Sequence, residues 1–161
     1  RHAGLDLLPR LLLRGDQLDV TVVRSILEAR LHNGPKVAEL AARRRSGTLA
    51  VRLQESIADL EADADPVGQQ RQALVFWDHI VDGADSIVFR LMFNTLRAAY
   101  EPALPALATM MAAEVSHSAA YRAVAQAIAD SDPAAAEAAA RELLEPATRA
   151  LTAALTAWEE Q

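Results

Sequence analysis

The chain has 161 residues, of which 52% are apolar and 24% charged, and its formal net charge is −6. That length suits one domain around a single core, and the acidic balance excludes a domain that holds DNA mainly through its own positive charge. The absence of cysteine excludes disulfides and thiolate metal sites and fits a cytoplasmic protein. No apolar run approaches the ~18 residues that cross a membrane, so we expect no membrane partner.

Apolar residues recur at spacings of three and four along most of the chain, and no run alternates between apolar and polar residues. The first pattern indicates helices with one buried face. The abundant Ala and Leu also favour helix. We therefore predict an all-α fold, an antiparallel helical bundle of about six or seven helices.

The first predicted elements lie before residue 45. Residues 5–13 form a short apolar segment in which Pro9 suits the first turn of a helix or breaks one, and a turn is expected at Gly15-Asp16. A helix is predicted to begin near Asp19. Asn33-Gly34-Pro35 is predicted to kink or break it, because proline lacks the amide proton and restricts the residue before it.

The next helix is predicted to follow Thr48, which suits an N-cap. Because apolar residues should face the core, its inward residues are expected to be Leu49, Val51, Leu53, Ile57 and Leu60. An acidic loop at residues 61–66 is expected to end this helix.

Residues 69–100 are predicted to form two helices joined at Gly83-Ala84-Asp85-Ser86. Glycine suits a left-handed C-cap, so Gly83 is expected to end the first helix, and Asp or Ser suits the N-cap of the second. The second helix is expected to bury one apolar face, which contains Ile87, Val88, Leu91, Met92, Thr95 and Leu96. Pro102 and Pro105 are expected to bend this helix or close it early.

Two further helices complete the predicted bundle. One covers about residues 114–129, and the last runs from residue 134 to about residue 158. Ser131-Asp132-Pro133 is expected to cap the last helix, because proline is favoured near a first helical turn.

Several weak motifs occur together in one order and spacing. Gln72 and Phe76 lie four residues apart, the junction at residues 83–86 follows, and residues 89–100 read FRLMFNTLRAAY. In this frame the chain resembles the effector-binding domain of the FadR subfamily of GntR transcription regulators, from residue 4 to about residue 151. Asn94 and Tyr100 make the second helix look most like that of the fatty acyl-CoA-responsive FadR branch.

The resemblance implies a function and partners. Residues 1–161 would be the effector-binding and dimerisation domain of a homodimer, and not an enzyme. A winged helix-turn-helix domain, expected upstream of residue 1, would contact DNA. A fatty acyl-CoA or related lipid-derived effector would modulate that contact. Two alternatives stay open: a metal-dependent sensor of small carboxylates from the same family, and a ligand-free helical dimerisation bundle.

Many members of this family bind a divalent metal through one Asp and three His residues. The resemblance places Gln72, Phe76, Tyr121 and Leu143 at those four positions. Phenylalanine and leucine cannot coordinate a metal, and a neutral Gln oxygen is a poor substitute for a carboxylate. We therefore expect no metal and no cofactor in that site.

The resemblance also implies an effector pocket around these positions, and pockets in helical bundles are mostly apolar with a few polar groups. Phe76 and Leu143 would form an apolar floor. Hydrogen bonds would come from Arg30, Gln72, Asn94, Tyr100 and Tyr121. Two alternatives stay open: Arg30 suits the surface of an amphipathic helix, and each Tyr suits a core position where its hydroxyl bonds a backbone group.

One further motif concerns metals. Glu114-x-x-His117 is half of a di-iron site, which needs a second copy and two further Glu residues on other helices. No second copy occurs, which argues against an enzyme of that type. His79 and His117 leave open a displaced single-metal site, although both residues also suit the surface or ordinary packing.

Overall fold

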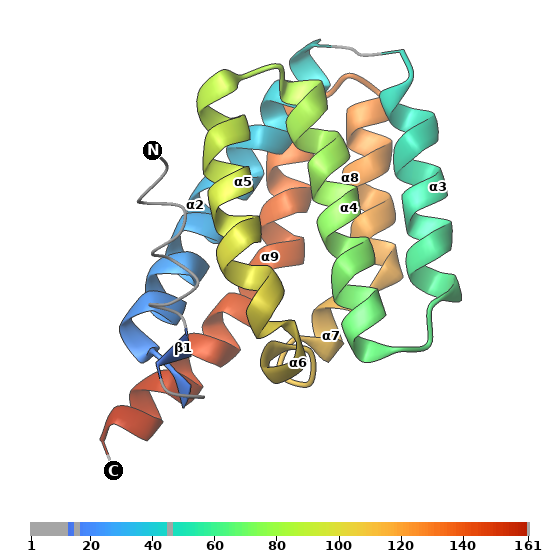
Figure 1. Ribbon diagram of the computed structural model, residues 1–161. Coiled ribbons are helices and arrows are strands. Elements are labelled where there is room, and N and C mark those ends of the chain that lie inside the picture. The colour runs from blue at the N-terminus through green and yellow to red at the C-terminus, as the bar shows by residue number, and fades with distance from the viewer. Residues whose placement is uncertain (1–12, 15–16, 45–46, 161) are drawn as a thin grey trace.

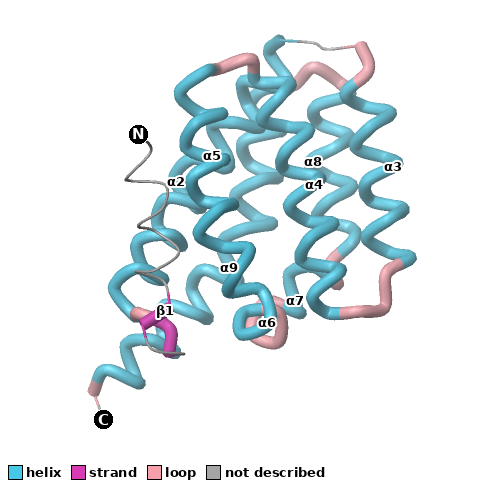
Figure 2. Tube along the Cα trace, in the orientation of Figure 1, coloured by secondary structure: helices cyan, strands magenta, loops and turns pink. Residues whose placement is uncertain are grey.

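The computed structural model describes residues 13–14, 17–44 and 47–160. Within them the chain folds into an all-α bundle, which confirms the predicted fold class (Figures 1 and 2). Residues 5–12 of the first apolar segment and the turn predicted at Gly15-Asp16 lie outside the described residues. Before the bundle, β1 (Leu13–Arg14) pairs with β2 (Gln17–Leu18) as a short antiparallel hairpin.

The long helices form two layers (Figure 1). One layer contains α3 (Leu49–Ala62), α4 (Pro66–Ala84) and α5 (Ile87–Tyr100). The other layer contains α2 (Val20–Arg44), α8 (Ser118–Ala129) and α9 (Pro133–Glu159). Between α5 and α8 the chain makes short helical turns, η1 (Glu101–Ala103), α6 (Leu104–Leu107) and α7 (Ala112–Val115). Helix α9 packs closely along α2 and α8, whereas α5 contacts the other long helices much less.

Helix α2 runs without a break from Val20 to Arg44, so the interruption predicted at Asn33-Gly34-Pro35 is wrong. Pro35 is buried inside the helix and removes one backbone hydrogen bond. The long contact between α2 and α9 outweighs that cost, as tertiary packing often does. Gly34 serves the same contact, because a Cβ there would collide with Cδ1 of Leu144 on α9.

The junction between α4 and α5 lies where it is predicted, but its residues differ in role. Asp85, with a φ of 49°, takes the left-handed position expected of Gly83, so that assignment is wrong. Gly83 lies inside α4, where a Cβ would collide with Cδ2 of Leu49 on α3. Ser86 caps α5 as predicted, because its side chain accepts a hydrogen bond from the N–H of Phe89 at 3.4 Å.

Other helix ends follow the predicted local signals. Asp19 precedes α2, and its Oδ1 accepts a hydrogen bond from the N–H of Thr21 at 3.0 Å. Helix α5 ends at Tyr100, and Pro102 and Pro105 lie in the short helical turns that follow. Helix α9 starts at Pro133, with Asp132 accepting a hydrogen bond from the N–H of Ala135 at 3.1 Å.

Two boundaries differ from prediction. Thr48 occupies the N-cap position of α3, but its side chain makes no capping hydrogen bond. The single helix expected over residues 114–129 is divided, since α7 ends at Val115 and α8 begins at Ser118. Helix α7 lies at the end of the bundle near α6, where the chain turns towards α8 (Figure 1).

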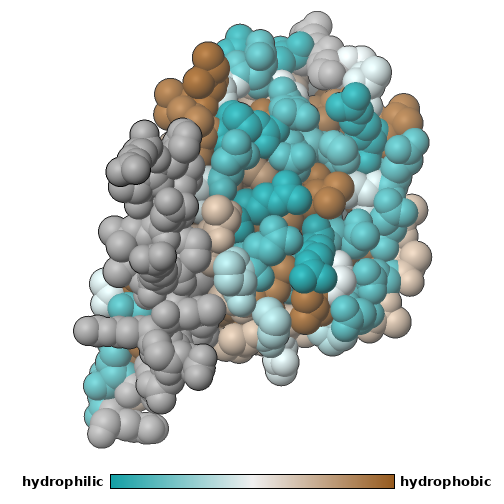
Figure 3. Space-filling model, viewed as in Figure 1, coloured by the Kyte–Doolittle hydropathy of each residue, from teal (hydrophilic) through white to brown (hydrophobic). Residues whose placement is uncertain are grey.

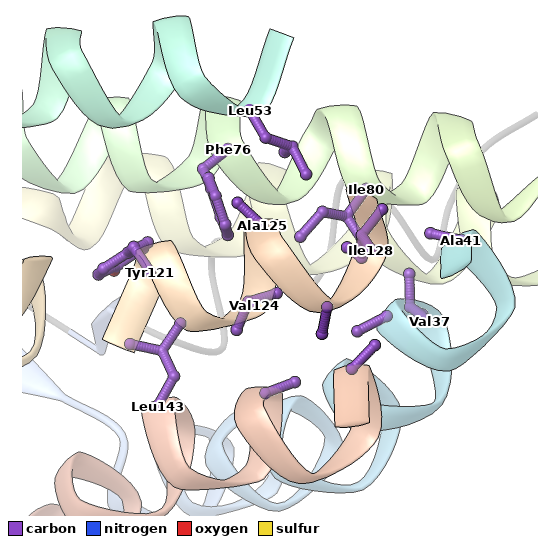
Figure 4. Close-up of a cluster of buried hydrophobic side chains, with 14 of the residues drawn as sticks. Val37, Ala41, Leu53, Phe76, Ile80, Tyr121, Val124, Ala125, Ile128 and Leu143 are labelled. Carbon is purple, nitrogen blue, oxygen red and sulfur yellow. The ribbon is translucent and has the colours of Figure 1, made fainter. Parts of the chain in front are cut away.

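The buried apolar side chains form two clusters. The larger cluster lies mainly between α3, α4, α8 and α9 and contains Phe76, Ile80, Tyr121, Val124 and Leu143, among others (Figure 4). The smaller one lies between α2, α9 and the segment from the end of α5 to Met111, and it contains Leu27, Tyr100, Leu104 and Met111. Within the described residues no helix has the length and apolar character needed to cross a membrane.

Several residues predicted to be buried are exposed. Val51 on α3 is 60% exposed, so its predicted inward position is wrong. Ile87, Val88 and Leu91 on α5 are 61–81% exposed, so this part of the predicted buried face is wrong too. The apolar surface over the start of α5 is visible at the upper left of Figure 3. A run of apolar residues at helical spacing therefore marks two different surfaces on α5, one turned inward and one turned to solvent.

Candidate functional site

A cavity of about 110 Å³ lies between α2, α4 and α5. Met111, Glu114 of α7 and Leu144 of α9 complete its lining. Its walls are mainly carbon, and the polar side chains on it, within the described residues, are Arg30, Asn33, Gln70, Arg97, Tyr100 and Glu114. Mostly apolar walls with a few polar groups are typical of small-molecule sites in helical bundles.

Helical periodicity explains why these residues share the cavity. On α4 the lining residues Gln70, Leu74, Trp77 and Val81 are spaced four, three and four residues apart. This spacing places side chains on one face of a helix. The lining residues of α2 and α5 follow the same rule, so the cavity lies where three helical faces meet.

A buried ion pair lies at the α7 end of the cavity. Nη2 of Arg30 donates a hydrogen bond to Oε1 of Glu114, and the two side chains are only 17% and 6% exposed. Nη1 of Arg30 is also buried and has no hydrogen-bond partner in the part of the chain that the structure describes. A guanidinium carries five N–H donors, so Arg30 can still donate to a bound molecule.

The pKa values of the buried groups reflect their surroundings. Burial raises the pKa of Glu114 above its ordinary value, and the attraction of Arg30 offsets only part of this effect. Burial lowers the pKa of Arg30, but the charge and hydrogen bond of Glu114 together with Tyr100 and Tyr121 outweigh burial, so the pKa is raised and the guanidinium stays charged. Burial raises the pKa of Tyr100 to about 12 and that of Tyr121 well above its ordinary value, so both hydroxyls keep their protons at neutral pH.

Met111 is held against the cavity by two neighbours. The hydroxyl of Tyr100 donates to Sδ of Met111. Nε2 of Gln70, a buried side chain, donates to the backbone carbonyl of Met111 at 3.3 Å. These contacts tie the segment that carries Glu114 to α4 and to α5, the two helices that form one wall of the cavity.

Comparison with known proteins gives the family. Residues 23–146 match the sequence model of the FCD domain. The chain belongs to the FCD-domain family. The FCD domain is the C-terminal domain of GntR-family regulators, so the GntR and FadR-like character predicted from the motifs is confirmed.

Two curated relatives agree with this family. An uncharacterized HTH-type transcriptional regulator of Mycobacterium bovis and the HTH-type transcriptional regulator Mce2R of Mycobacterium tuberculosis are each 57% identical to the chain over 155 residues. The matched residues make up 96% of this chain and 65% of each relative. The chain thus spans 65% of the length of these regulators.

The FCD domain brings two of the predicted effector residues to the cavity. Arg30 on α2 and Tyr100 at the end of α5 both line it. The alternative of a surface position for Arg30 is wrong, because its side chain is 17% exposed and paired with Glu114. The contact of either residue with an effector stays a prediction.

Three other predicted residues lie in the packed core beside the cavity and do not line it: Phe76, Tyr121 and Leu143 (Figure 4). The rings of Phe76 and Tyr121 meet edge to face, with centroids 5.0 Å apart and an interplanar angle of 78°. The hydroxyl of Tyr121 is buried without a hydrogen-bond partner among the described residues, so it does not make the backbone bond of the alternative interpretation. An effector role for these three residues stays a prediction.

The last two predicted residues lie away from the cavity. Gln72 is partly buried on α4 but is not among the residues that line the cavity. Asn94 is exposed on α5, and its Oδ1 accepts a hydrogen bond from Nη1 of Arg90 at 3.3 Å. Contact between these two residues and an effector likewise stays a prediction.

Sequence reasoning missed most of the cavity lining, including Gln70, Trp77, Met111 and Glu114. Gln70 and Trp77 could have been found, because they share a helical face with Leu74 and Val81. Glu114 has no such local signal as a cavity residue. Its partner Arg30 lies 84 residues away in the sequence, and only the fold brings the two together.

The residues at the family's metal position do not fit a metal. Phe76 and Leu143 have no donor atom there, and both are buried in apolar packing. Within the described residues no group of three or more His, Cys, Asp or Glu side chains could hold an ion. His79 on α4 and His117 beside α8 therefore form no such group. The cavity of this FCD domain instead offers hydrogen bonds and apolar contact.

Proposed function

We propose that the chain is the ligand-sensing domain of a FadR-like GntR-family transcription regulator, and that its effector binds in the cavity between α2, α4 and α5. The observation that carries this proposal is the unused, buried Nη1 donor of Arg30 beside an apolar cavity. The names of the two relatives support a regulatory role. Such a regulator would act in the cytoplasm, where it meets DNA.

The effector that fits this lining is a fatty acyl-CoA or a related lipid-derived acyl compound. The apolar walls suit an acyl chain, and the polar end suits its carbonyl oxygen. The volume of about 110 Å³ is smaller than the roughly 300–1,000 Å³ of pockets that enclose a drug-sized ligand. A coenzyme A head group would therefore remain outside, and a long chain would require α5 to move.

Regulation would follow from a difference in affinity. A ligand shifts an equilibrium between two arrangements only as far as it binds one of them better. Helix α5 is the element most suited to two arrangements, since it packs less closely on the other long helices than they do on one another. Its movement would reorient an upstream winged helix-turn-helix domain. A tenfold change in operator affinity needs about 1.4 kcal/mol of such coupling.

The exposed apolar residues of α5 suit a homodimer contact. Ile87, Val88 and Leu91 are spaced so that they form one patch on the helix surface. Exposed apolar patches often mark contacts between proteins. A two-fold partner is expected of a regulator that binds paired half-sites on DNA, and the same patch would then serve both copies.

Thermal unfolding with acyl-CoAs of graded chain length tests the ligand proposal. A ligand present at 100 times its dissociation constant should stabilise the domain by about 2.7 kcal/mol. Ala73→Leu, which fills the cavity from α4, should abolish this gain. Ala58→Leu, on the exposed face of α3, should keep it.

Other outcomes of this experiment would favour the alternatives. No stabilisation by any acyl-CoA would favour a bundle that serves dimerisation alone. Stoichiometric zinc, manganese or nickel in protein purified without chelator would favour a metal-dependent sensor of small carboxylates.

A further inference from the structure

The charges around the cavity are unevenly distributed. Within the described residues, the charged side chains that line it are Arg30, Arg97 and Glu114. Arg97 is 37% exposed and lies 3.9 Å from carboxylate oxygens of both Asp78 and Glu101. It therefore belongs to the solvent side of the cavity, where water screens charge. Arg30 and Glu114 lie at the buried end and neutralise each other.

The buried end thus combines zero net charge with a free donor. Nη2 of Arg30 is committed to Glu114, while Nη1 has no partner in the described part of the chain. A buried donor without a partner is unfavourable, so an acceptor on a bound molecule would be favoured here. The N–H donor at Nη1 of Arg30 does not by itself distinguish a carbonyl oxygen from a carboxylate oxygen, because either can accept its hydrogen bond.

Glu114 makes that distinction. Its side chain is 6% exposed, so little water separates it from a neighbouring group. A carboxylate bound at Nη1 would add a second negative charge beside Glu114, and like charges at one buried site repel strongly. A neutral carbonyl oxygen would satisfy Nη1 without adding charge. Beside Glu114, Arg30 would therefore favour a neutral acceptor over an anion.

We propose that this site binds the uncharged carbonyl of an acyl derivative, such as a thioester, ester or amide, and discriminates against the free carboxylate of the same chain. Glu114 is the residue that sets this specificity. The inference rests on the proposed function, because it names the chemical class that the effector presents to Arg30.

Three compounds with one apolar body test this inference: octanoate, octanamide and the ethyl thioester of octanoic acid. Their dissociation constants are measured by calorimetry at pH 7 with the 161-residue chain. The thioester and the amide should bind at least about tenfold more tightly than octanoate, which corresponds to about 1.4 kcal/mol. Equal or tighter binding of octanoate would overturn the inference and leave the effector cavity standing.

Glu114→Gln provides the second measurement. This variant leaves the positive charge of Arg30 uncompensated, so the preference should reverse and octanoate should bind at least about tenfold more tightly than the thioester. Glu142→Gln, on the exposed face of α9, is the matched control and should keep the original order. An unchanged order in Glu114→Gln would overturn the role of Glu114.

Two further outcomes complete the design. Failure of all three compounds and of the acyl-CoA series to bind the unchanged chain would overturn the proposed function, and this inference with it. If Glu114→Gln does not fold, the ratio of octanoate to thioester affinity in the unchanged chain decides the matter by itself.

Discussion

The two sides of α4 face very different surroundings. On one side, Phe76 and Ile80 pack against α3 and α8, and both side chains are at most 1% exposed. On the other side, Leu74 and Trp77 line a cavity and remain partly exposed. The first side contributes most of the dense core, while the second leaves room for a ligand. The proposed effector site thus lies where packing is incomplete, in the part of a fold from which a movable element would come.

This contrast predicts the largest effect for a core truncation. Phe76→Ala should lower the free energy of unfolding by about 3–5 kcal/mol, because it removes a fully buried ring from a tightly packed region. Trp77→Ala should cost less, since that ring is only partly buried, and should instead weaken acyl-CoA binding. Urea unfolding and calorimetry separate the two effects. Equal losses of stability in both variants would mean that the two sides of α4 do not differ as described.

The buried ion pair allows the next test. Glu114→Leu should lower the free energy of unfolding by about 3–5 kcal/mol, because it leaves the buried charge of Arg30 unpaired. The double variant with Arg30→Met should recover much or all of this loss, since apolar groups of similar size often replace buried pairs without cost. A double-mutant cycle with urea unfolding measures both. If the double variant is as unstable as the single one, the packing around the pair matters more than its charges.

The sequence predicts the packed side of the domain better than the cavity side. Helix spacing and caps predict the helices that carry Phe76, Tyr121 and Leu143, because these signals are local. The family position of the metal ligands directs attention to the same residues, yet the open space lies beside them. The gap follows from how α5 rests on α4 and from the break before α8, and both depend on contacts that no local pattern encodes.

Pro35 illustrates the same limit for the fold. Its local effect predicts a break, and only the continuous contact of α2 with α9 explains why the helix persists. Leu91 shows the same limit for burial. Its helical spacing predicts an apolar face, but the spacing alone does not tell whether that face is buried in the core or exposed on the surface.

The outer face of α5 supports a test with little effect on the isolated fold. Leu91→Asp should convert a dimer to a monomer and change the stability of the monomer by no more than about 0.5 kcal/mol, because Leu91 is 61% exposed. Light scattering coupled to size exclusion measures the mass. Ala58→Asp, on the exposed face of α3, is the control and should stay dimeric. If the unchanged chain is itself a monomer, the outer face of α5 is not a dimer contact.

The pH dependence of stability should show the smallest effect, and its sign follows from burial. The pKa of Glu114 is higher in the folded domain than its ordinary value of 4.5, so folding favours the protonated form. This contribution to stability is present below pH 4.5 and is lost as the pH rises through the raised value. Urea midpoints measured from pH 4 upward should therefore fall less steeply in Glu114→Gln than in Glu142→Gln. Parallel curves would mean that Glu114 titrates as it does in the unfolded chain.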